Sequence, residues 1–146
     1  MLKRLTILAA LALPMVAWTH ENQKNPEIRY RHAVMEAMSN QVAAMALILQ
    51  GKVDRADEMQ VNARALAEAA TLVGGLFPEN SKGADALPLI WEEPAKVATA
   101  AQTAAEATAA FAEIAASGSK AEIAKGFKAV ADACKGCHER YKAEED

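Results

Sequence analysis

Four segments of the chain repeat apolar residues at spacings of three and four, the periodicity of a helix with one buried face. The clearest segment begins after Pro26 and is closed by Gly51, and its inward stripe alternates steps of three and four residues. The stripe consists of Ile28, Arg31, Met35, Met38, Val42, Met45 and Leu49. This pattern is typical of a helix in a bundle.

Three more helices are expected further along the chain. The second covers about residues 54–72, and the third runs from near residue 91 to Ser117. The fourth starts at Ser119, where Glu122 completes a capping box. Their stripes are Met59, Ala63, Leu66, Ala70 and Val73; Val97, Ala101, Ala104, Thr108, Phe111 and Ala115; and Ile123, Phe127, Val130, Cys134, Cys137, His138 and Tyr141.

The connections between these helices decide the fold class. Most links are short, and residues 77–88 form one longer connection that contains proline, asparagine, serine and glycine. No segment alternates with a period of two for long enough to be a strand. The sequence therefore predicts an all-α protein, an antiparallel up-down-up-down four-helix bundle.

Composition adds one point to this picture. Hydrophobic residues make up 52% of the chain, but aromatic residues only 5%, and much of the apolar content is alanine. A core of such small side chains leaves room for a large apolar group that the chain itself does not supply.

The first residues are typical of a secretory signal, because Lys3 and Arg4 precede an apolar run over residues 5–12. We expect a signal peptide at 1–19 and one four-helix-bundle domain at 20–146. The apolar run is too short to span a bilayer, so the processed protein should have no stable membrane anchor. An uncleaved anchor is the alternative. Export predicts a periplasmic location.

The chain is mildly acidic, with a formal net charge of −3. Loss of Lys3 and Arg4 with the signal peptide would take this charge to −5. A mildly acidic net charge argues against nucleic acid as a partner, so no nucleic-acid partner is expected.

The two cysteines of the chain, Cys134 and Cys137, are followed directly by His138. C-x-x-C-H is the attachment sequence of c-type haem. Two thiols at this spacing share a helix face and can form thioethers with the haem vinyl groups, while the histidine ligates the iron. A disulfide and half of a zinc site are the alternatives, although a zinc site needs two more ligands. The motif predicts one covalent haem c, held inside the bundle.

With this motif in place, the chain resembles the class II cytochromes c, the cytochrome c′ family. The resemblance extends from about Glu27 to the end of the chain. It rests on the C-x-x-C-H near the C-terminus, the Arg31-to-Met35 spacing, Phe77-Pro78 in the long connection and Leu89-Ile90-Trp91 before the third helix. That family is a four-helix bundle, which agrees with the predicted fold.

The resemblance implies roles for individual residues. His138 would be the proximal iron ligand, and Cys134 and Cys137 the thioether sites. Arg31 matches an arginine near the haem propionates, and Met35 matches the position that faces the distal side of the iron. Lys142 matches a basic residue one turn after the histidine, where the family more often has arginine.

The family also implies two functions. In low-spin members a first-helix methionine binds the iron, and such a His/Met site transfers single electrons. With Met35 as a possible sixth ligand, we take electron transfer by an exported, soluble cytochrome as the leading prediction. The alternative is a five-coordinate, high-spin cytochrome c′ that binds nitric oxide or carbon monoxide. A haem-free protein with a structural disulfide is a third hypothesis.

Other candidates carry less weight. Met38 and Met45 are expected to fill the core, and His20 and His32 to be solvated. Basic residues on and after the last helix form either a solvated face or a docking patch for an acidic redox partner, and this partner is not identified. They are Lys120, Lys125, Lys128, Lys135, Arg140 and Lys142.

A homodimer is expected from the resemblance. No enzyme is expected, since neither a nucleophile elbow nor a phosphate loop is present.

Overall fold

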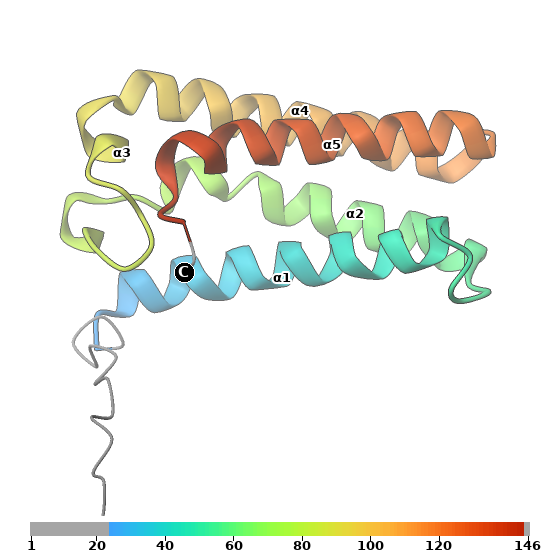
Figure 1. Ribbon diagram of the computed structural model, residues 1–146, viewed down its shortest axis with the longest axis horizontal. Coiled ribbons are helices and arrows are strands. Elements are labelled where there is room, and N and C mark those ends of the chain that lie inside the picture. Colours follow the sequence, from blue (N-terminus) through green and yellow to red (C-terminus); the bar gives the residue numbers. More distant parts are fainter. Residues whose placement is uncertain (1–23, 145–146) are drawn as a thin grey trace, which may run out of the picture.

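The computed structural model describes residues 24–144, which form an antiparallel bundle of four long helices and one short helix (Figure 1). The helices are α1 (Pro26–Leu49), α2 (Met59–Ala70), α3 (Leu89–Glu92), α4 (Pro94–Ser117) and α5 (Lys120–Tyr141). Single turns of 3₁₀ helix cover Ala56–Glu58, Val73–Gly75 and Glu79–Ser81. The predicted all-α four-helix bundle is therefore confirmed.

The helix ends follow local sequence signals. The Asn25 side chain accepts a hydrogen bond from the backbone N–H of Glu27 at 2.9 Å and caps α1. Gly51, which follows α1, has a φ of 65°, a conformation that glycine adopts without strain. At the start of α5, Ser119 and Glu122 form the predicted capping box.

Two helix boundaries differ from the prediction. The second helix is shorter than residues 54–72, because a 3₁₀ turn lies on each side of α2. The third is divided, since Glu93 leaves the helical conformation with φ −122° and ψ 50° and separates α3 from α4. The cause is Pro94, whose ring disfavours a helical conformation in the residue before it.

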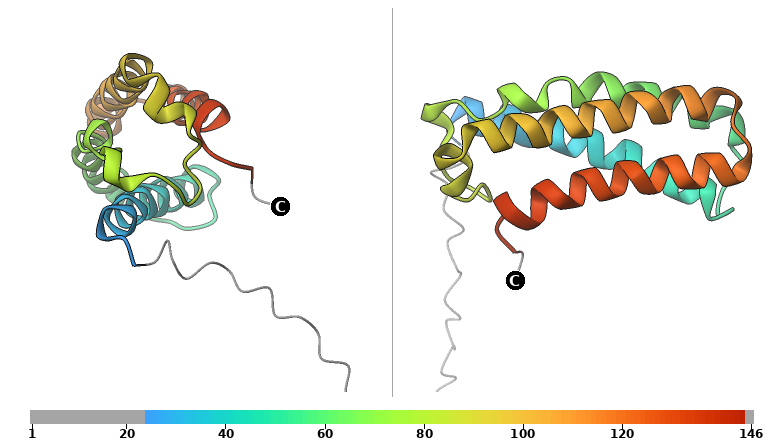
Figure 2. Two further views of the ribbon diagram at one scale, coloured as in Figure 1. Left: turned by 90° about the vertical axis from the view of Figure 1, so that its left-hand side faces the viewer. Right: turned by 90° about the horizontal axis from the view of Figure 1, so that it is seen from above.

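Three pairs of neighbouring helices pack directly, α1 on α2, α2 on α4, and α4 on α5. The fourth side of the ring lies between α1 and α5 (Figure 2). Stripe residues of the packed helices form the core, where Met45, Leu66, Phe111 and Val130 are almost completely buried. Alanines at core positions, Ala63 among them, let the helices approach closely.

Candidate haem site

Two cavities lie along the side of the bundle between α1 and α5. The larger has a volume of about 400 Å³ and is closed at one end by the connection 77–88. The smaller, about 200 Å³, reaches further into the bundle between α2 and α4. Both are lined by Met35 and Ser39 from α1 and by Cys137 and His138 from α5. We call these two volumes the outer and the inner cavity.

The last turns of α5 bring the C-x-x-C-H motif to these cavities. Cys134 lines the inner cavity and Cys137 lines both, and both thiols are free and half-buried. Burial raises the pKa of each thiol, and the neighbouring Cys134 raises that of Cys137 further. Both side chains are therefore neutral thiols at pH 7. They face the cavities instead of the helix-packed core, which explains why they are less buried than the stripe predicted.

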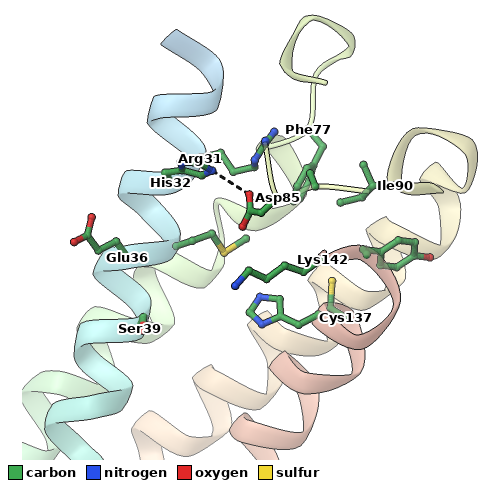
Figure 3. A pocket seen from close by; sticks show the side chains of 13 residues that line it. Arg31, His32, Glu36, Ser39, Phe77, Asp85, Ile90, Cys137 and Lys142 are labelled. Atoms are coloured by element: carbon green, nitrogen blue, oxygen red, sulfur yellow. Dashed lines mark hydrogen bonds and ion pairs between the residues drawn. The ribbon is translucent and has the colours of Figure 1, made fainter. Parts of the chain in front are cut away.

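His138, in the last turn of α5, lines both cavities. Its neighbours Cys137 and Lys142 lie beside the outer cavity (Figure 3). Partial burial lowers the pKa of the imidazole, and the positive charge of Lys142 lowers it further. Both effects favour the neutral ring, which is the form that binds a metal ion.

The residues of the two cavities fit a covalent haem. Two thiols three residues apart and a neutral imidazole lie on one wall, which is the donor set that haem c requires. The inner wall is made almost wholly of apolar side chains, Leu66 and Val73 among them. The outer cavity has the size of an ordinary cofactor pocket.

Arg31 lies at the end of the outer cavity and is only 2% exposed. Its guanidinium donates to the carbonyl oxygens of Ser81 at 2.8 Å and Gly83 at 2.9 Å, and it stacks over the Phe77 ring. Burial lowers its pKa. Arg31 thus fastens the long connection to α1, while its implied role near the haem propionates stays a prediction.

His32 forms a contact that the sequence did not reveal. It is half-exposed, as a solvated histidine would be, but its Nε2 lies 3.0 Å from the Asp85 carboxylate at the rim of the outer cavity (Figure 3). The Asp85 carbonyl oxygen accepts a hydrogen bond from the Ala143 N–H at 2.8 Å. The connection therefore bridges α1 and the end of α5.

Comparison with known proteins gives the family. A family model described as "Cytochrome C'" matches residues 26–142. The chain belongs to the cytochrome c′ family. It is 28% identical over 148 residues to a cytochrome c′ of Rhodospirillum rubrum, with 98% of this chain and 100% of that protein covered. It is 27% identical to a cytochrome c′ of Pararhodospirillum photometricum, with 79% and 94% covered.

Solved structures agree with the fold. A cytochrome c′ variant from Alcaligenes xylosoxidans superposes with a TM-score of 0.75 at 23% identity, with 82% of this chain and 94% of that chain covered. Because cytochromes c′ bind haem c covalently, family membership also confirms the predicted cofactor. The individual roles of Cys134, Cys137, His138, Met35 and Arg31 stay predictions.

The export predictions fall outside the described part of the chain. Residues 1–23 are not described, so the signal peptide at 1–19, its cleavage and His20 are not addressed by the structure. Among residues 24–144, no helix is both long and apolar enough to cross a membrane.

In this cytochrome c′, Glu93 holds the motif end of α5 against α4. Its carboxylate binds the Arg140 guanidinium at 2.7–2.8 Å, the Lys96 ammonium at 2.8 Å and the Tyr141 hydroxyl at 3.0 Å. The Tyr141 ring is buried in a cluster that includes Cys137. Hydrogen bonds from Lys96 and Arg140 lower the pKa of Glu93 to about 2. Sequence reasoning missed Glu93, because Arg140 and Tyr141 lie 47 and 48 positions away along the chain.

We expect Glu93→Gln to destabilise the folded protein at pH 7 and to have little effect below about pH 2. A depressed carboxyl pKa contributes stability above the usual pKa, and this contribution is lost as the pH falls through the folded-state value. Urea unfolding midpoints of the two proteins should therefore differ at pH 7 and converge between about pH 5 and pH 2. Glu113→Gln, a change on the exposed side of α4, is the control and should show no such convergence.

The basic residues of α5 do not form a continuous positive patch. Lys128 pairs with Asp132 at 2.6 Å, Lys135 with Glu139 at 3.3 Å, and Arg140 with Glu93. Neighbouring acidic groups thus offset three of these charges. This arrangement favours a solvated face over a docking patch for an acidic partner.

Proposed function

We propose that the protein is an exported cytochrome c′ that binds a diatomic gas, nitric oxide foremost, at a covalent haem. The observation that carries this proposal is the apolar inner cavity, which extends from His138 to the wall formed by α1. Similar cytochromes c′ from Alcaligenes xylosoxidans were solved with nitric oxide and with carbon monoxide bound. These structures favour gas binding over electron transfer, the leading prediction from sequence.

Each motif residue has a distinct task in this proposal. Cys134 and Cys137 anchor the group to α5, and the neutral imidazole of His138 ligates its iron. When bound, the haem supplies an iron with one coordination position left for a gas molecule. The apolar side chains of the inner cavity exclude water from that position, so a neutral diatomic does not compete with a bound water there.

Electron transfer is the second candidate. Met35 supports it, because this methionine lines both cavities together with His138 and carries a thioether that can ligate iron. A His/Met site would fill both axial positions and leave none for a gas. The two functions therefore differ in whether Met35 binds the iron.

We also propose a periplasmic location and a homodimer. Support for a dimer comes from large apolar side chains that are exposed on α1 and in or near α2, where a second copy could cover them. They are Tyr30, Leu47, Val61 and Leu72.

A visible spectrum of the purified protein, before and after nitric oxide is added, tests the function. We expect the broad bands of a high-spin, five-coordinate haem, and a new spectrum once nitric oxide binds. Sharp low-spin bands with a methionine-to-iron charge-transfer band would support electron transfer instead. A protein without a Soret band after expression with haem-attachment machinery would contradict both functions.

A further inference from the structure

Ser39 lines both the outer and the inner cavity, and its side chain is exposed to solvent. Ser39 follows Met35 by four residues, so it is on the same face of α1, one turn closer to the middle of the bundle. It lines the same two cavities as His138 of α5. Figure 3 shows Ser39 on α1, across the outer cavity from Cys137 on α5. Ser39 and His138 therefore border one space from opposite helices.

The Ser39 hydroxyl has no hydrogen-bond partner among residues 24–144. This separates it from the threonines of α4, because Thr99, Thr103 and Thr108 each donate to a backbone carbonyl oxygen one turn earlier. A side chain that is already bonded to its own helix must break that bond to meet a ligand. Ser39 has no such bond to its own helix, so a ligand in the cavities would compete only with solvent for its hydroxyl.

The surroundings make this donor effective. Apart from Ser39 and His138, the inner cavity is lined only by side chains of carbon and sulfur. They are Met35, Met38, Val42, Leu66, Val73, Ala100, Ala101, Ala104, Cys134 and Cys137. Ser39 itself is exposed and also borders the outer cavity, so its hydrogen bond would gain strength from these apolar surroundings only where a bound haem shields it from water. With His138 committed to the iron, Ser39 is the one oxygen-bearing side chain left on this wall.

We propose that Ser39 is a specificity-determining residue, whose hydroxyl donates a hydrogen bond to a gas molecule held on the α1 side of the haem. This inference rests on the proposed function. Nitric oxide bound to ferrous haem carries a bent geometry and excess electron density, so it accepts a hydrogen bond better than linear carbon monoxide does. Ser39 thus favours nitric oxide over carbon monoxide.

The test compares Ser39→Ala with the wild type in the haem-loaded ferrous protein. One net hydrogen bond corresponds to about a three- to tenfold change in an equilibrium or rate. We therefore expect nitric oxide to dissociate about three- to tenfold faster from Ser39→Ala. The N–O stretching frequency should rise, because a donor no longer draws electron density into the ligand. Carbon monoxide dissociation should change less than nitric oxide dissociation.

Two controls distinguish the effect of the Ser39 hydroxyl from that of side-chain size and from that of removing any hydroxyl on a helix. The threonine of Ser39→Thr and the valine of Ser39→Val have side chains of the same shape, but only threonine keeps a hydroxyl donor. Ser39→Val should therefore show the higher N–O stretching frequency of the two. Thr103→Ala removes an exposed, back-bonded hydroxyl of α4 and should match the wild type.

The results that overturn the inference differ from those that overturn the proposed function. A wild-type protein that forms no nitric oxide complex would overturn the function and this inference with it. A normal complex whose N–O frequency and dissociation rate are the same in Ser39→Ala would overturn this inference alone.

Discussion

Replacing both Cys134 and Cys137 with alanine is expected to make the haem fully extractable by acid–acetone. In the wild type, two thioether bonds should keep the group attached to the denatured chain. The variant can hold haem only through His138 and the apolar cavity walls, and these contacts are lost when the bundle unfolds. The measurement is the fraction of haem absorbance that stays with the protein after extraction.

A single replacement, Cys134→Ala, is the matched control. It should keep the haem attached through Cys137 and shift the absorption bands slightly, because one vinyl group stays unreacted. Haem retained covalently by the double variant would mean that the attachment residues lie elsewhere. The central interpretation of the motif would then be wrong.

Met35→Ala is expected to increase the rate of carbon monoxide binding about tenfold. Met35 is partly buried and lines both cavities, so its side chain must move aside for a ligand on the α1 side of the haem. Forcing extra atoms into a packed site typically costs about 1–3 kcal/mol, and each 1.4 kcal/mol is a factor of ten. Flash photolysis of the carbon monoxide complex measures the rate, and the spectrum should stay high-spin.

Met45→Ala is the control on the same helix. Met45 is completely buried but lines neither cavity, so the change should lower stability by about 2–5 kcal/mol and leave carbon monoxide binding unchanged. A wild-type protein that is low-spin and becomes high-spin in Met35→Ala would show that Met35 ligates the iron. Electron transfer would then replace gas binding as the function.

Short-range patterns made much of the fold predictable. The stripe positions of α2, such as Met59 and Leu66, are buried as their spacing indicates, and the α5 capping box forms as its sequence predicts. Such signals act within one or two helical turns, so they can be read along the chain. The adjacent Cys137 and His138 could likewise be placed at one site, since a single helix carries both.

The rest of the site depends on contacts between distant segments. Arg31 bonds to Ser81 across 50 positions, His32 to Asp85 across 53, and Glu93 to Arg140 across 47. No local pattern specifies such pairs, because each depends on how the helices stack and where the long connection crosses. The division between α3 and α4, unlike these pairs, has a local cause, because Pro94 disfavours a helical conformation at Glu93. The helical periodicity on both sides of Pro94 concealed this break.

The position of the two cavities between α1 and α5 affects how fast small molecules can enter them. Small molecules can pass between solvent and the cavities there without separating α1 from α2, α2 from α4, or α4 from α5. Rearranging packed helices takes microseconds to milliseconds, whereas exposed side chains change rotamer in picoseconds to nanoseconds. Access therefore depends on side chains, the exposed ones at the rim such as His32 and then Met35 inside, and a ligand need not wait for the bundle to open.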